Sequence, residues 1–87
     1  MEQHQKADKL QKNFGQVIRN RRLALGISQE NLAENCDLHR NYISEIERGI
    51  KSPSLKTITL LAIALGCLPH ILLQEAEELL NDDTFTS

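Results

Sequence analysis

The chain has very few aromatic residues, with one Tyr, two Phe and no Trp among its 87 residues. Hydrophobic residues nevertheless make up 40% of the sequence, so aliphatic side chains must build the core. Such a composition favours helices. The length suffices for one small domain and excludes most enzyme architectures.

Long apolar runs are also absent. The longest apolar stretch, residues 58–73, is interrupted by a threonine, a glycine, a proline and a histidine. It falls short of the roughly 18–20 residues that a membrane span requires. Two cysteines, Cys36 and Cys67, occur in a chain whose first twelve residues are mostly polar and contain no signal segment. We therefore expect a soluble protein of the reducing cytoplasm with no membrane partner.

Residue patterns for catalysis or metal binding are missing as well. His4, His39 and His70 lie on separate predicted elements, and neither cysteine has a histidine at ligand spacing. No Gly-rich phosphate loop and no CxxC or HxxxH pair occurs. The sequence predicts no enzyme activity, cofactor, metal site or small-molecule ligand.

Charge is distributed unevenly around a net value of −2. Residues 1–26 contain six basic and two acidic side chains, whereas residues 67–87 contain five acidic and no basic ones. A local basic patch, rather than the net charge, therefore decides whether the domain binds a polyanion. The acidic run is interpreted as a solvated face and tail, or alternatively as a dock for a basic partner; it comprises Glu75, Glu77, Glu78, Asp82 and Asp83.

Hydrophobic periodicity predicts a first helix from about residue 12, or from an Asp8 cap, to residue 25. Its apolar positions are Leu10, Phe14, Ile18 and Leu25, and Gly26 follows its end. Residues 1–11 form an N-terminal extension, and the sequence leaves open whether it belongs to this helix. Ser28 is the predicted cap of a second helix ending near Cys36.

A third helix is predicted after a short connection around residues 36–39, carrying Leu38, Tyr42, Ile43 and Ile46 and closing at Gly49. A fourth helix spans residues 55–65 with a Ser54 cap, and a fifth runs from about residue 70 to 80 with Pro69 in its first turn. The prediction is an all-α, five-helix domain over residues 12–80 with a helix-turn-helix. Residues 81–87 are a predicted disordered tail.

The first four helices and their connections carry a specific set of residues in order and in register. These are Phe14-Gly15, Ile18-Arg19, Arg22, Gly26-Ile27-Ser28-Gln29-Glu30, Leu32-Ala33, Tyr42-Ile43-Ser44, Ile46-Glu47-Arg48-Gly49, Pro53-Ser54 and Leu65-Gly66. Through them the chain resembles the Cro and lambda-repressor-like helix-turn-helix family over roughly residues 14–73. It looks most like the controller proteins of restriction–modification systems.

Three positions depart from the family pattern. Asp37 stands where the family usually has a turn glycine, and we expect it to adopt a positive φ. His39 and Leu68 stand where a capping side chain is usual, so the helices that follow them start without one.

The resemblance implies that the third helix enters the DNA major groove while the second braces it over the backbone. The base-reading positions are His39, Arg40, Asn41, Ser44 and Glu45, and the phosphate-contacting positions are Ser28, Gln29, Tyr42, Arg48 and Lys51. Arg40 suits guanine and Asn41 suits adenine by their hydrogen-bonding groups. Arg22 and Glu47 match a family ion pair, although two exposed, unpaired charges are the alternative.

The fourth and fifth helices carry more apolar surface than one small bundle needs. On the fourth helix, the predicted core positions are Leu55, Ile58, Leu61, Ala62 and Leu65. We expect the excess to close a homodimer, with an interface of Leu60, Ile63, Ile71, Leu72, Leu73 and Ala76. The alternative is that residues 1–11 or the fifth helix of the same chain cover Leu60 and Ile63.

The resulting hypothesis is a cytoplasmic, homodimeric transcriptional regulator, acting as repressor or activator, that binds a pseudo-palindromic double-stranded DNA operator. RNA polymerase is a further expected partner. The competing hypothesis is an antitoxin or another partner-binding module with the same fold.

Overall fold

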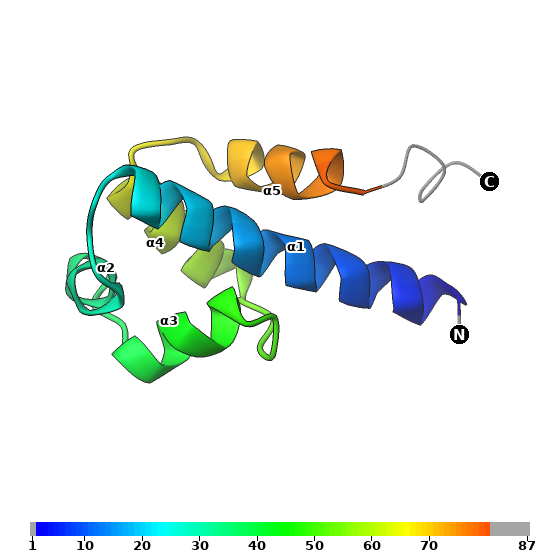
Figure 1. Cartoon of the computed structure of the whole chain (residues 1–87), viewed down its shortest axis with the longest axis horizontal. Helices are drawn as coiled ribbons and strands as arrows, with labels where there is room; N and C mark the ends of the chain where they lie inside the picture. Colours follow the sequence, from blue (N-terminus) through cyan, green and yellow to red (C-terminus); the bar gives the residue numbers. More distant parts are fainter. Residues whose placement is uncertain (1, 81–87) are drawn as a thin grey trace.

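The computed structural model describes residues 2–80 of the chain. This part forms five helices and no strand: α1 (Glu2–Ala24), α2 (Gln29–Cys36), α3 (Arg40–Glu47), α4 (Leu55–Leu65) and α5 (Pro69–Glu78) (Figure 1). The predicted all-α, five-helix fold is confirmed. The predicted disordered tail, residues 81–87, lies outside the described residues.

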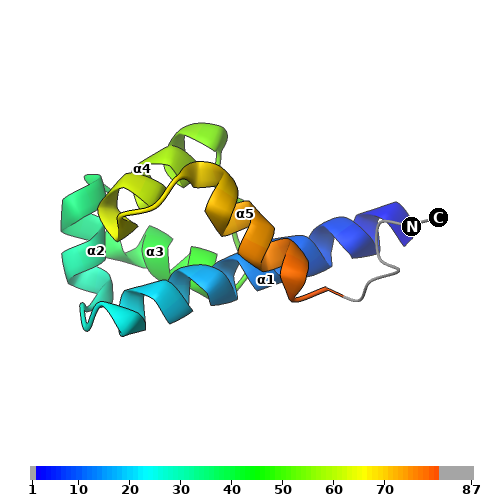
Figure 2. The same ribbon diagram turned by 90° about the horizontal axis from the view of Figure 1, so that it is seen from above.

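Helix α1 is the longest helix and packs against most of the others. Its main packing partners are α3 and α5, while α2 packs against α3 and α4. Figure 2 shows α5 crossing over α1, so that the first and last helices of the chain are in direct contact. The helix-turn-helix unit is thereby held against a long helix rather than standing alone.

The first helix begins at Glu2, ten residues before the predicted start at residue 12 and six before the alternative cap at Asp8. Residues 2–11 contain no glycine or proline and are rich in Glu, Gln, Lys, Ala and Leu, which are good helix formers. Nothing in this stretch stops the helix, so the N-terminal extension and α1 are one continuous element. At about 1.5 Å per residue, its 23 residues span about 34 Å.

One core joins all five helices. Its largest fully buried side chains are Ile18, Leu32, Cys36, Ile43, Ile46, Leu61 and Leu72. Two residues predicted in the core, Leu25 and Leu55, are instead 54% and 76% exposed. Each lies at a helix end, where the chain turns away from the bundle. Leu38 lies in the connection before α3, not on that helix, and its backbone N–H donates to the Ala33 carbonyl at 2.9 Å.

Helix ends follow local chemistry. The Ser28 and Ser54 hydroxyls accept hydrogen bonds from the backbone N–H groups of Asn31 and Thr57, as expected for N-caps. At His39 and Leu68 no side chain caps the following helix, as predicted. Helix α5 runs from Pro69 to Glu78, about one residue earlier at its start and two at its end than predicted.

Part of the predicted dimer interface lies inside the single chain. Leu72 and Ala76 are both fully buried, so neither side chain can meet a partner. The apolar pattern of α5 did not show that α1 already covers one of its faces. Ile63 is 69% exposed, while Leu60 and Leu73 are half-buried against the core.

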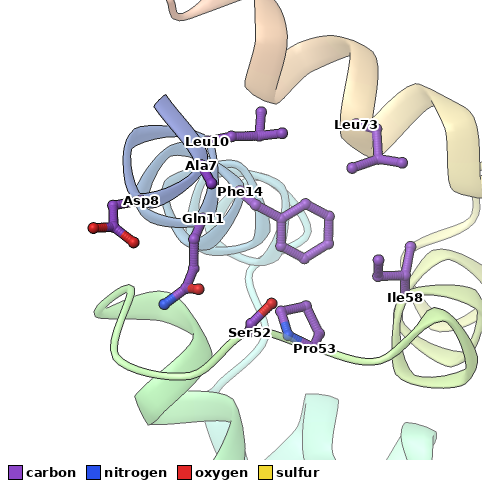
Figure 3. A pocket seen from close by; sticks show the side chains of 9 residues that line it. All are labelled: Ala7, Asp8, Leu10, Gln11, Phe14, Ser52, Pro53, Ile58 and Leu73. Carbon is purple, nitrogen blue, oxygen red and sulfur yellow. The ribbon is translucent and has the colours of Figure 1, made fainter. Parts of the chain in front are cut away.

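A hollow of about 210 Å³ opens where α1, α4, α5 and the segment before α4 meet (Figure 3). Apolar side chains form most of its wall: Leu10, Phe14, Pro53, Ile58 and Leu73. The polar Gln11 at its edge points from α1 toward the chain that follows α3.

No single helix within residues 2–80 has the length and hydropathy of a membrane span. Helices α4 and α5 reach that composition only together, as a pair bent by 96°.

The turn between α2 and α3 stores conformational strain at Asp37. Its φ of 57° and ψ of 43° place a side-chain-bearing residue in the left-handed region, as expected from the sequence. We predict that Asp37→Gly raises the free energy of unfolding by about 1 kcal/mol, because glycine carries no Cβ in this conformation. Urea unfolding of the two proteins measures the difference. Asp37→Ala is the control and should be less stable than wild type; equal gains from Gly and Ala would contradict the explanation.

Candidate nucleic-acid interface

Helices α2 and α3 form a tight helix-turn-helix joined by three residues, 37–39. Leu32 and Ala33 of α2 and Ile43 and Ile46 of α3 are buried and join the two helices to the core. The opposite face of α3 is solvent-exposed at His39, Arg40 and Asn41. This face is free to meet a partner.

A buried ion pair fixes the end of α3 to α1. Arg22 Nε and Nη2 donate to the two carboxylate oxygens of Glu47 at 2.7 and 3.0 Å. The two side chains are only 8% and 2% exposed. The hydrogen bonds to Glu47 raise the pKa of Arg22, so the guanidinium stays charged. The alternative of two exposed, unpaired charges is wrong.

The same carboxylate reaches α2. Gln29 Nε2 donates to Glu47 Oε1 at 3.1 Å, and Arg22 Nη1 donates to the Ile27 carbonyl at 2.9 Å. Glu47 thus receives hydrogen bonds from α1 and α2 at once, and the start of α2 is held at a fixed position relative to α3. The Gln29 amide retains a second hydrogen for a phosphate oxygen.

Three of the predicted base-reading residues, His39, Arg40 and Asn41, lie at the N-terminal end of α3. Arg40 Nε lies 3.8 Å from Glu30 Oε1 of α2. A carboxylate at Nε leaves both terminal amino groups of the guanidinium free, and these are the donors that fit guanine O6 and N7. This contact could not be predicted from local sequence, because Glu30 and Arg40 lie on different helices.

Three further predicted positions lie one turn along α3 or on its flank. Ser44, Glu45 and Tyr42 are half-buried, and Tyr42 packs partly against the core. Their partial exposure leaves room for contact with a groove or backbone. Ser28, predicted as a phosphate contact, uses its hydroxyl within the chain, where it caps α2 and donates to Asn31 Oδ1.

The predicted phosphate contacts Arg48 and Lys51 lie at the opposite end of α3, and both are exposed. Backbone hydrogen bonds close the turn that carries them, with Ile50 N donating to the Glu45 carbonyl at 2.9 Å. Cations therefore lie beyond the C-terminal end of α3, while the exposed base readers His39, Arg40 and Asn41 lie at its N-terminal end.

A second ion pair, missed at the sequence level, fastens α5 to α1. Arg21 Nε and Nη2 donate to Glu75 at 2.9 and 2.6 Å. These hydrogen bonds lower the pKa of Glu75, so the carboxylate stays ionised. Glu77 and Glu78 are exposed, as predicted for a solvated acidic face, but Glu75 is half-buried and paired, because the crossing of α5 over α1 brings it to Arg21. Arg21 and Glu75 are 54 residues apart in the sequence, so no local pattern indicated that they pair.

Within the part of the chain that the structure describes, no three His, Cys, Asp or Glu side chains gather as metal ligands. Cys36 is buried and its Sγ lies 3.7 Å from the Leu60 carbonyl, and Cys67 is half-buried; both thiols are free.

Comparison with known proteins places this geometry in a family. A helix-turn-helix family model matches residues 18–72. Over 61 residues the chain is 52% identical to the control protein C.BamHI of Bacillus amyloliquefaciens, covering 69% of this chain and 75% of that protein. The chain belongs to the Cro/lambda-repressor-like helix-turn-helix family.

Solved structures agree. The restriction-modification controller protein C.AhdI from Aeromonas hydrophila is 44% identical, with a TM-score of 0.69 over 70% of this chain and 92% of that one. The clp gene regulator ClgR from Corynebacterium glutamicum is 32% identical, with a TM-score of 0.76 over 79% of this chain and 73% of that one.

Family membership makes this a DNA-binding protein rather than an enzyme, as the sequence predicted. The matched segment begins at residue 18, so most of α1 lies before the family model. The contacts made by residues 2–17 therefore lie outside the segment that the family model describes.

The two ion pairs should differ in their contribution to stability. Glu47→Gln leaves the buried Arg22 guanidinium without its counter-charge, and we predict a loss of about 3 kcal/mol in the free energy of unfolding. Glu75→Gln is the matched control; its pair with Arg21 is partly exposed, so its loss should be about 0–1 kcal/mol. Urea unfolding at neutral pH measures both values. Equal losses would show that burial does not govern these pairs.

Proposed function

We propose that this protein is a homodimeric, sequence-specific regulator of transcription that occupies a pseudo-palindromic DNA operator and controls a restriction–modification system. The observation that carries the proposal is the exposed N-terminal end of α3, held in place through the buried Arg22–Glu47 pair. Similarity to the control protein C.BamHI and the controller protein C.AhdI supports the regulatory role.

In this proposal α3 lies in the major groove. Arg40 and Asn41 hydrogen-bond to base edges. His39, Ser44 and Glu45 contact neighbouring bases, and the Glu45 carboxylate accepts a hydrogen bond from a cytosine amino group. The phosphate contacts come from both ends of the unit; they are Ser28, Gln29, Tyr42, Arg48 and Lys51. Neutral donors near the start of α2 and on α3, and the cations Arg48 and Lys51 beyond the C-terminal end of α3, together fix the register of the unit on the duplex.

The proposed dimer forms through α4 and α5. After Leu72 and Ala76 are removed from the predicted interface, its apolar surface consists of Leu60, Ile63, Ile71 and Leu73. Ile63 is the most exposed of these side chains and is its centre. In a twofold dimer the two α3 helices meet half-sites about 34 Å apart, or roughly 10 base pairs.

We further propose that the protein acts in the cytoplasm, needs no small-molecule ligand and meets RNA polymerase at the promoter its operator overlaps. The concentration of the protein then determines transcription from this promoter, because dimerisation makes operator occupancy depend on protein concentration.

Selection of bound sequences from a randomised DNA pool tests the operator. The expected result is a palindromic motif with half-sites about one helical turn apart. Absence of enrichment would contradict the proposal and favour the partner-binding, antitoxin-like alternative.

The two kinds of DNA contact should separate by mutation. Arg40→Ala should lose about 1–3 kcal/mol of discrimination at one base pair of each half-site. Lys51→Ala should weaken binding to all sequences alike and lower the slope of log K against log salt by about 0.9 for each protomer. Fluorescence-anisotropy titrations on the selected operator and on single-base variants measure both. If Arg40→Ala weakened all sequences equally, Arg40 would not read a base.

The dimer surface is tested by placing a charge at its centre. Ile63→Asp should convert the dimer to a monomer, because a buried, unpaired carboxylate is costly to desolvate. Sedimentation equilibrium at tens of micromolar measures the mass. Leu23→Asp, at a similarly exposed apolar residue on α1, is the control and should remain dimeric. A dimeric Ile63→Asp protein would place the interface elsewhere.

A further inference from the structure

The N-terminal half of α1 is fastened to the turn that follows α3. Gln11 Nε2 donates to the Gly49 carbonyl at 2.8 Å, across 38 residues of sequence. Figure 3 shows the Gln11 side chain pointing from α1 in this direction. Residue 11 precedes the segment that the family model matches. The extension of α1 therefore makes a specific contact beside the helix proposed to read DNA.

Close packing at Gly49 brings Lys12 to the same turn. Gly49 has φ of 76°, and a Cβ built there would lie 3.0 Å from Lys12 Cα and 3.2 Å from Lys12 Cγ. A side chain at this position would require α1 to shift by a few tenths of an ångström, besides the strain of its positive φ. The first carbons of the Lys12 side chain thus lie against Gly49, and the side chain as a whole is exposed.

The turn around Gly49 also contains two basic residues. Arg48 precedes Gly49 and Lys51 follows it by two residues, and all three basic side chains are exposed. Among the salt bridges formed by residues 2–80, none involves Lys12. The acidic residues nearest along these two elements are Asp8, one turn before Lys12, and Glu45 and Glu47 of α3. Glu47 pairs with Arg22, and none of the three is paired with Lys12, so its charge is available to an anion.

We propose that Lys12 is a third phosphate-binding cation, acting with Arg48 and Lys51, so that the extended α1 adds a DNA-backbone contact outside the helix-turn-helix. This inference rests on the proposed function. An ammonium on a flexible stem suits phosphate as a point charge, whatever the base sequence. Gln11 is a positioning residue, because its hydrogen bond to Gly49 fixes the turn against α1.

The test compares Lys12→Gln with Lys6→Gln. Both variants remove one positive charge from α1, but six residues at about 100° each turn Lys6 about 120° away from Lys12. Lys6 pairs instead with Glu2 at 3.7 Å. Affinity for the selected operator and for a mixed-sequence duplex of equal length is measured over a series of salt concentrations.

We expect Lys12→Gln to weaken binding to both duplexes by the same factor. The slope of log K against log salt should fall by about 0.9 for each protomer, or about 1.8 for a dimer. Lys12→Arg should retain the wild-type slope, because it keeps the charge. Lys6→Gln should behave as wild type.

A purely structural role gives a different result. A cation near the C-terminal end of α3 also stabilises the helix dipole. Lys12→Gln would then lower the melting temperature and leave the salt slope unchanged, and that outcome overturns the inference while the proposed function stands. If wild-type protein bound neither duplex, the proposed function and the inference would fall together.

Discussion

The buried Arg22–Glu47 pair is the constraint on which the arrangement of the domain depends. One carboxylate receives hydrogen bonds from α1 and α2 while belonging to α3, so three helices share a single buried point. The cost of desolvating two charges is high, and it is offset only where geometry and additional hydrogen bonds are good. The pair therefore specifies one relative position of the helices more strongly than apolar packing alone would, and that position presents the exposed end of α3.

Backbone-level contacts reinforce this position. A Cβ at Gly15 would lie 2.1 Å from the Ile46 carbonyl oxygen, so α1 touches the backbone of α3 without an intervening side chain. The Gln11 contact to Gly49 continues the same line of attachment beyond the end of α3. The Arg21–Glu75 pair attaches α1 to α5. Helix α1 is therefore attached both to α3, which is proposed to read DNA, and to α5, which is proposed to form the dimer. A single element thus sets the geometry between these two surfaces.

Features that depend on local chemistry were predictable from the sequence. Ser28, Ser54 and Gly26 marked helix ends correctly, and Asp37 was recognised as the residue with positive φ. Features that depend on how the helices cross could not be predicted from the sequence. Leu72 and Ala76 look like surplus apolar surface until α5 is seen against α1, and Glu75 looks solvated until Arg21 lies beside it. The early start of α1 escaped prediction because residues 2–11 are largely exposed and carry little apolar periodicity.

The separation between the core and the exposed end of α3 has an evolutionary consequence. Arg40 and Asn41 contribute nothing to the buried core, and the first turn of α3 has no side-chain cap whose loss would unfold it. Substitutions at these two positions therefore leave folding almost unaffected, since exposed changes away from caps and packing rarely exceed about 0.5 kcal/mol. Descendants of such a scaffold can diverge in the DNA sequences they recognise while every step along the way remains a folded protein.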